Sequence, residues 1–229
     1  MPLLGSGVLA NWGGVLAEAE EDYNAWHSLE HLPERLAVPG FLRGRRCVAV
    51  AGTDPRLKYF MGYEVESPEV LVSAPYLARL NDPTAWTRRI LSAYVAPCRT
   101  VCRVLASQGR GVGGFLGTVQ IVPSGTRDAA RALAAGAWMA AAMARPGIIG
   151  AHAVEGDDTL GQQPTAEKRF RESRGEPDRT VAFALLIDGL DEGTTAAALA
   201  DAAHAAAAVG TVTATLYRTQ HVLARGDLA

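Results

Sequence analysis

Two histidines and a glutamate lie within one short segment, and their side chains are suited to acid–base chemistry. The segment reads His27-Ser28-Leu29-Glu30-His31. A histidine has its pKa near the working pH, so His31 is a candidate general acid or base. Its alternative role is structural: a buried imidazole bonded to a backbone carbonyl, with Glu30 capping a loop amide. The residue types leave both roles open.

The same five residues match the H-x-x-E-H pattern that some zinc metalloproteases carry on a helix. Histidines at positions i and i+4 face the same side of a helix, as zinc binding requires. Pro33 disturbs the helix two residues later, and no distant acidic residue stands out as a third ligand. We therefore predict no metal at this segment, and we expect His27 to be a surface residue on the charged side of the helix.

Polar residues on neighbouring elements could share a ligand cavity with His31. Tyr59, Met61 and Tyr63 occupy every second position of a predicted strand, so they lie on the same face of it. Tyrosine hydroxyls on an otherwise apolar wall can orient a ligand oxygen, although the same pattern is typical of aromatic core packing. The remaining candidates for ligand contacts belong to the same half of the chain: Asn11, Trp26, Glu30, Arg45 and Arg103.

Other catalytic patterns are absent or weak in the sequence. The glycine-rich run at 109–114 opens a strand and not a helix, which indicates a linker instead of a phosphate-binding loop. Cys47, Cys98 and Cys102 form no C-x-x-C pair, so they indicate buried thiols in a reducing compartment. The first residues lack the basic region of a secretory signal. We expect a cytoplasmic protein that needs no cofactor.

The composition excludes several classes of protein. The 229 residues include 22 basic and 24 acidic side chains, with a formal net charge of −2 and 48% hydrophobic residues. This balance is typical of a globular protein and provides no basic surface for nucleic acid or an anionic membrane. No apolar run approaches the roughly 20 residues needed to cross a bilayer. The expected partner is a small molecule.

The predicted elements follow the order strand, helix, strand, strand, helix, strand in each half of the chain. Helical spacing covers 17–37, where Pro33 should kink or break the helix near 30–33. In the first half the other expected elements are strands at 6–12, 45–51, 58–65 and 100–107, and helices at 68–80 and through Trp86, Ile90 and Tyr94. In the second half they are strands at 115–122, 180–188 and 211–216, and helices at 126–145 and 194–208.

The recurrence of these elements predicts a tandem duplication. Pro39-Gly40 of the first half recurs as Pro146-Gly147 in the second. We predict two ferredoxin-like βαββαβ units, at 1–108 and 112–229, which pack sheet to sheet as an intramolecular dimeric α+β barrel. This pseudo-dimer within one chain leaves further homodimerisation open. The second unit carries a polar insertion at 157–178, which should be an exposed loop with at most one short helix.

The segment from Tyr23 to Phe41 resembles the helix of EthD-like proteins in the dimeric α+β barrel superfamily. The shared pattern is an aromatic residue, then Glu30-His31-Leu32-Pro33, then Pro39-Gly40-Phe41 before a strand. The resemblance covers most of residues 8–106. It implies a cavity between sheet and helices that suits a small apolar or aromatic ligand, and relatives include enzymes for dehydration, isomerisation and cofactor-free oxidation.

Two functions remain open at this stage. The first is an EthD-like enzyme without metal or organic cofactor, a dehydratase, isomerase or oxygenase with His31 as acid or base. The second is a non-catalytic small-ligand-binding or structural protein of the same fold. Ala137 and Trp138 stand where a second copy would repeat Glu30 and His31. We therefore expect the site in the first half, and Trp138 filling the equivalent space in the second.

Overall fold

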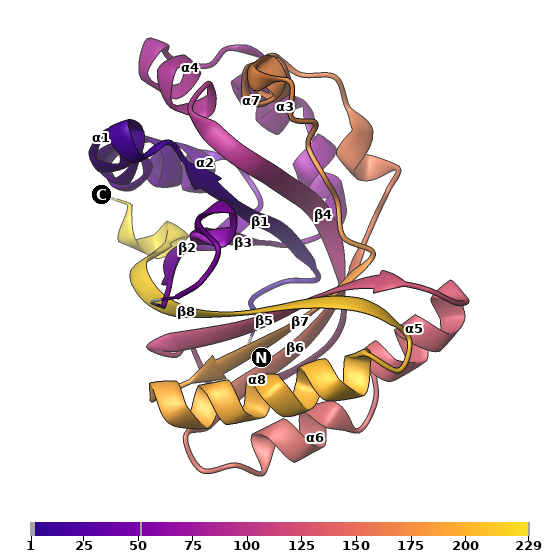
Figure 1. Cartoon of the computed structure of the whole chain (residues 1–229). Coiled ribbons are helices and arrows are strands. Elements are labelled where there is room, and N and C mark those ends of the chain that lie inside the picture. Colours follow the sequence, from indigo (N-terminus) through magenta and orange to yellow (C-terminus); the bar gives the residue numbers. More distant parts are fainter. Residues whose placement is uncertain (1–2, 51, 229) are drawn as a thin grey trace.

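A closed antiparallel barrel of eight strands carries helices on its outer surface (Figure 1). The computed structural model describes residues 3–50 and 52–228. Around the barrel the strands follow the order β4-β1-β3-β2-β8-β5-β7-β6, and β6 pairs with β4 to close it. Their bounds are β1 (Gly7–Val15), β2 (Phe41–Ala49), β3 (Tyr59–Val65), β4 (Tyr94–Gly109), β5 (Phe115–Pro123), β6 (Ile148–Gly156), β7 (Phe183–Gly189) and β8 (Gly210–Ala224).

The helices divide between the two halves of the barrel. The first half carries α1 (Glu20–Trp26), the π-helical turn η2 (His27–His31), α2 (Leu32–Ala37), α3 (Ala74–Asn81) and α4 (Ala85–Leu91). The second carries α5 (Arg127–Ala134), α6 (Trp138–Met143), α7 (Ala166–Arg171) and α8 (Glu192–Ala206). Short 3-10 turns complete them: η1 (Ala17–Ala19), η3 (Pro55–Leu57), η4 (Pro68–Val72), η5 (Leu160–Gln162), η6 (Glu172–Arg174) and η7 (Arg225–Asp227). No helix in the described ranges is long and apolar enough to span a membrane.

Alternation along the strands separates three apolar cores. Trp12 of β1 donates a hydrogen bond to Thr118 of β5 at 3.2 Å, and these strands are not neighbours in the barrel. The contact therefore crosses the barrel interior, where Trp12 also packs against Phe60 with ring centroids 5.2 Å apart. The opposite faces of the strands hold Met61 and Tyr63 in the first half, and they form two outer cores against the helices.

Corresponding positions in the two halves share their backbone geometry. The strand order β4-β1-β3-β2 of the first half has the same form as β8-β5-β7-β6 of the second. The first helical segment of each half is followed by a Pro-Gly turn before the next strand. Gly40 and Gly147 have φ values of +88° and +94°, a left-handed conformation that strains any residue with a Cβ. Because β2 pairs with β8 and β4 with β6, the sheets of the halves join edge to edge into one barrel.

Several expected boundaries differ from the structure. The helix at 17–37 does not break near Pro33; it stays helical through the π turn at 27–31, where Leu32 N–H donates to the carbonyl of His27. This wider turn accommodates a proline that lacks an N–H. The expected helix through Tyr94 ends at Leu91, and Tyr94 begins β4. The expected helix at 126–145 is divided between α5 and α6 at the turn containing Gly136.

The insertion at 157–178 is only in part the exposed loop expected: residues 158–159 and 162–164 are exposed, whereas the short helix within it is buried on one face. It contains α7, which belongs to the second half of the chain but packs against α3 and α4 of the first (Figure 1). Thr165 caps this helix at its N-terminus, and Ala166 N–H donates to the side chain of Asn81 at 3.1 Å. Glu167 and Arg171 are buried on its inner face. The segment is therefore part of the wall around the first half.

Candidate functional site

A small cavity lies between the strands of the first half and the helices that cover them, and α7 closes it. Its polar lining residues come from five elements: Asn11, His31, Arg35, Arg99, Glu167 and Arg171. Three tyrosines and three apolar side chains complete the wall: Tyr63, Tyr76, Tyr94, Leu9, Met61 and Leu91. The cavity volume is about 30 Å³, which is enough for one or two water molecules and too small for an aromatic ring.

His31 is the last residue of the π turn and lies at the cavity wall. Its ring packs on Trp26 with centroids 4.2 Å apart and an interplanar angle of 31°. The Nδ1 atom is buried and has no hydrogen-bond partner within the described part of the chain. Burial, together with the positive charge of Arg35, lowers the pKa of His31 well below its ordinary value. The imidazole is therefore neutral near pH 7, and its buried surroundings disfavour the protonated form as long as no anion lies beside it.

His27 is not the surface residue that the sequence suggested. It is fully buried, and its Nε2 lies 3.1 Å from the hydroxyl of Tyr63. Burial and the charge of Arg46 lower the pKa of His27 well below the ordinary value. The sequence did contain a signal for this burial: His27 follows the buried Tyr23 by four positions, which places both side chains on one face of the helix.

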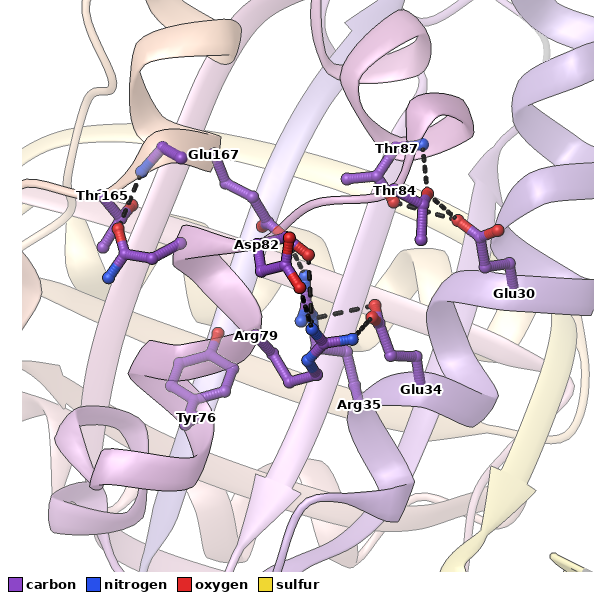
Figure 2. Close-up of polar contacts among 12 residues, drawn as sticks. Glu30, Glu34, Arg35, Tyr76, Arg79, Asp82, Thr84, Thr87, Thr165 and Glu167 are labelled. Carbon is purple, nitrogen blue, oxygen red and sulfur yellow. Dashed lines mark hydrogen bonds and ion pairs between the residues drawn. The ribbon is translucent and has the colours of Figure 1, made fainter.

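Three arginines surround the cavity with unequal charge compensation. Arg35 pairs with Glu167 of α7 and lies 3.5 Å from a carboxylate oxygen of Glu34. Figure 2 shows both carboxylates directed toward the Arg35 guanidinium. Arg171 pairs with Asp178 at 2.8 Å. The third, Arg99, has no ion pair in the described ranges.

Of the residues proposed from the sequence, His31, Tyr63 and Asn11 line the cavity. Trp26 lies behind His31, fully buried, and donates a hydrogen bond to Thr87 at 3.0 Å. Trp26 therefore supports the imidazole and does not itself line the cavity.

Glu30 lies outside the cavity and has a positioning role. Its Oε1 accepts hydrogen bonds from the hydroxyls of Thr84 at 2.6 Å and Thr87 at 3.1 Å (Figure 2). Thr84 also caps α4 through the backbone N–H of Thr87. Glu30 thereby connects the π turn to the start of α4, and it accepts from hydroxyl groups and not from the loop amide suggested by its sequence position.

Tyr59 does not line the cavity, although it shares a strand face with Tyr63. Its hydroxyl donates to Glu20 at 2.9 Å and accepts from Asn24 at 3.0 Å. Burial is the main cause that raises the pKa of Tyr59 to about 12. The hydrogen bond from Asn24 opposes this shift, whereas the hydrogen bond to Glu20 and the Glu20 charge add to it. The place of Tyr59 at the start of β3, beside α1, removes it from the ligand candidates.

Arg45 and Arg103 also lie elsewhere. Arg45 pairs across the sheet with Gly62, so it shares the inner face with Phe60 and not the outer face with Tyr63. Inside the barrel Arg45 forms an ion pair with Asp188 at 2.6 Å. Arg103 lies on the surface and pairs with Glu69 at 3.2 Å. The position of Arg45 depends on strand pairing, which the sequence does not specify.

Four charged cavity residues were not identified from the sequence. Arg35 follows His27 and His31 at a spacing of four, which places all three on one side of a helix, and this spacing could have indicated it. Arg99 alternates with Val101 on β4, a weaker indication. Glu167 and Arg171 gave no indication, because they reach the cavity from the polar insertion of the other half.

Trp138 is largely buried in the apolar core of the second half, and the pocket beside it lies between two helices, away from the sheet face that His31 faces in the first half. This pocket of about 150 Å³ lies between α6 and α8, with Trp138, Arg145 and Asp201 in a wall otherwise made of alanines. The indole N–H of Trp138 donates to the backbone carbonyl of Ala134 at 2.8 Å. Alanine side chains are too small to close the gap beside the indole. No group of three or more metal-ligating side chains occurs in the described ranges of the chain.

Comparison with known proteins gives structural relatives only. No protein-family model matches the chain, and no curated protein sequence does. An anthrone oxidase-like protein has a TM-score of 0.62 and 13% identity, with 97% of this chain and 94% of the other covered. A proposed monooxygenase from Fusobacterium nucleatum has a TM-score of 0.60 and 6% identity, covering 97% and 96%.

A proposed monooxygenase from Lactobacillus acidophilus has a TM-score of 0.56 and 7% identity, with 96% of this chain and 97% of the other covered. At these identities the likeness shows the fold alone, and none of these three structures is described as an EthD-like protein. These three structures share one fold. The chain therefore has the fold of the dimeric α+β barrel proteins.

Proposed function

We propose that the cavity of the first half binds a small apolar or aromatic molecule and that His31 moves a proton on it. The observation that carries the proposal is the imidazole at the cavity wall, whose buried Nδ1 has no hydrogen-bond partner in the described residues. Trp26 holds the ring in place through stacking. The lowered pKa of His31 keeps the ring neutral in the empty protein, and the anion left on the ligand by proton transfer would stabilise the imidazolium beside it.

The reaction class that we favour is oxygenation without a cofactor. His31 takes a proton from an acidic C–H group, and the resulting carbanion transfers an electron to dioxygen. Recombination gives a hydroperoxide, which loses water to leave a carbonyl, so that CH₂ and O₂ become C=O and H₂O. Structural neighbours described as an anthrone oxidase-like protein and as proposed monooxygenases support this class. Dehydration or isomerisation would use the same proton transfer.

The cavity volume sets a condition on this proposal. About 30 Å³ cannot hold an aromatic ring, so a ligand must displace part of the wall. The segment around α7 is the candidate, because it covers the cavity from another part of the chain. The same small volume favours the second candidate function, a non-catalytic protein that binds only a very small ligand or serves as a structural unit.

Oxygen consumption with anthrone as probe separates these functions. We expect the purified protein to accelerate oxygen uptake above the spontaneous rate, and His31→Ala to remove the acceleration. His204→Ala is the matched control, because His204 lies exposed on α8 and should leave the rate unchanged. An unchanged rate in His31→Ala would exclude His31 as the base. No acceleration by the unmodified protein would contradict the oxygenase class for this probe.

We further propose that the chain is an EthD-like tandem of two ferredoxin-like units at 1–108 and 112–229. The matching strand orders and the left-handed glycines at 40 and 147 support a duplication. The second unit has no equivalents of Glu30 and His31. This loss supports a ligand site in the first unit alone, with the second unit in a structural role. An experimental structure whose two halves fail to superpose would contradict the duplication.

A further inference from the structure

We infer that the molecule bound in this cavity carries a carboxylate, which Arg99 and Arg35 recognise and whose place Glu167 takes in the empty protein. The inference rests on the proposed function, because it names the ligand class of the same cavity. The chemistry on which it depends is the surplus of guanidinium groups over carboxylates in the wall.

Arg99 carries the uncompensated positive charge. Arg35, Arg99 and Arg171 line the cavity, whereas Glu167 is the single carboxylate among its lining residues. Arg171 has a second acid, Asp178, behind the wall at 2.8 Å. Among the described residues the Arg99 guanidinium donates one hydrogen bond, to the hydroxyl of Tyr76 at 3.0 Å, and forms no ion pair. A guanidinium with free donors beside a cavity matches the planar, bidentate geometry of a carboxylate.

Arg35 supplies a second unsatisfied donor. Its Nη1 atom is buried without a hydrogen bond in the described ranges, although Glu34 Oε2 lies 3.5 Å away. The side chain itself is 1% exposed, so bulk water does not satisfy the group. A carboxylate offers about four acceptor positions and can accept from Arg99 and Arg35 together. A neutral apolar ligand would leave Arg99 without an ion pair and the Arg35 Nη1 atom without a hydrogen-bond acceptor.

Glu167 holds the position that a ligand carboxylate would take. It reaches the wall from α7, pairs with Arg35, and lies 3.7 Å from Arg171. The Glu167 carboxylate therefore lies between two buried arginines. In this position it competes with the carboxylate of a ligand for the same guanidinium groups. Removing its charge should tighten the binding of a carboxylate, because the repulsion between like charges in a buried site is lost.

The test compares benzoate with its neutral analogue benzamide by isothermal titration calorimetry. We expect benzoate to bind and benzamide to bind at least about 10-fold more weakly. Arg99→Met should weaken benzoate binding by roughly 10- to 100-fold, the range for a lost charge-assisted hydrogen bond. Arg103→Met is the matched control, because Arg103 lies on the same strand but on the surface, outside the cavity. Its benzoate affinity should equal that of the unmodified protein.

Glu167→Gln makes the test specific, since it should change affinity in the opposite direction. A variant that merely disturbed the wall would weaken benzoate binding, whereas removal of a competing charge strengthens it. Equal affinities for benzoate and benzamide, or unchanged affinity in Arg99→Met, overturn the carboxylate inference while leaving a ligand cavity in place. Because the benzoate ring must displace part of the wall, acetate is titrated beside it, and absence of binding of both anions at about 10 mM also overturns the inference. Loss of the proposed function is recognised separately, by oxygen uptake that does not depend on His31.

Discussion

Glu167 forms a buried ion pair with Arg35, although 132 residues separate the two along the chain. The side chains are 4% and 1% exposed, so the pair is almost completely shielded from water. Arg35 belongs to the helix that follows His31 directly, whereas Glu167 belongs to the insertion of the second half. This contact fastens α7 over the cavity and makes the first half depend on a segment from the second.

Glu167→Ala should therefore destabilise the protein strongly. The variant leaves the Arg35 guanidinium buried without its main partner, which costs about 3–5 kcal/mol of unfolding free energy. Urea unfolding followed by tryptophan fluorescence measures the change. Arg169→Ala is the control on the same helix, because Arg169 is exposed and should shift stability by less than about 0.5 kcal/mol. Equal effects of the two substitutions would show that the buried ion pair adds nothing.

The sequence allowed the order of elements to be predicted, because hydrophobic periodicity and Pro-Gly turns are local signals. Alternation placed Tyr59 and Tyr63 on one strand face, and of the two only Tyr63 lines the cavity, because Tyr59 lies at the start of the strand. Arg45 was not, because the face that it shares with Gly62 depends on the pairing of β2 and β3. The cover that Glu167 provides could not be predicted either, since contact across 132 residues leaves no local pattern.

Stability should fall in mild acid because of His27 and His31. Burial lowers the pKa of both side chains well below 6.5, so neither binds a proton readily in the folded state. The unfolded chain does bind protons below about pH 6.5, and acid therefore favours unfolding. Each histidine reduces the unfolding free energy by at most about 1.4 kcal/mol per pH unit in this window.

Chemical unfolding at pH 7.5 and pH 5.5 tests this pH dependence. The decline between the two pH values should be smaller in His27→Gln, which has no titrating group at that position. His204→Gln serves as control, because His204 is exposed. An identical decline in all three proteins would assign the acid sensitivity to other groups.

Asp188 should stabilise the barrel interior through its charge. Burial alone would raise its pKa, but the Arg45 guanidinium and the contact with His152 lower the pKa of Asp188 to about 2. A lowered acid pKa means a stabilisation that is present above about pH 4 and is lost as the pH falls through 2. Asp188→Asn should therefore cost about 3–5 kcal/mol at pH 7, because Arg45 loses its buried partner.

The difference between Asp188→Asn and the unmodified protein should shrink between pH 4 and pH 2, because protonated Asp188 is as neutral as asparagine. Guanidinium unfolding across this range measures it. A difference that stays constant with pH would show that the carboxylate contributes through shape and hydrogen bonds alone. Asp201→Asn is the control, because its ion pair with Arg145 lies on the surface.

Truncation of His31 separates a working site from a filled core. The imidazole packs on Trp26 but its Nδ1 bonds to nothing in the described ranges, so His31→Ala orphans no partner. The side chain also borders a cavity, so its removal deprives few neighbouring atoms of close packing. We expect a loss of about 1 kcal/mol or less, seen as a fall of roughly 2–4 °C in melting temperature.

Trp138→Ala provides the comparison in the second half. Trp138 is largely buried and belongs to the apolar core, so its truncation should cost about 3 kcal/mol or more, although the adjoining pocket reduces this figure. Thermal melts should therefore give Trp138→Ala a clearly lower melting temperature than His31→Ala. If His31→Ala proves the less stable of the two, the imidazole is a packing element. The proton-transfer role would then lose its basis, because a residue selected for packing needs no access to a ligand.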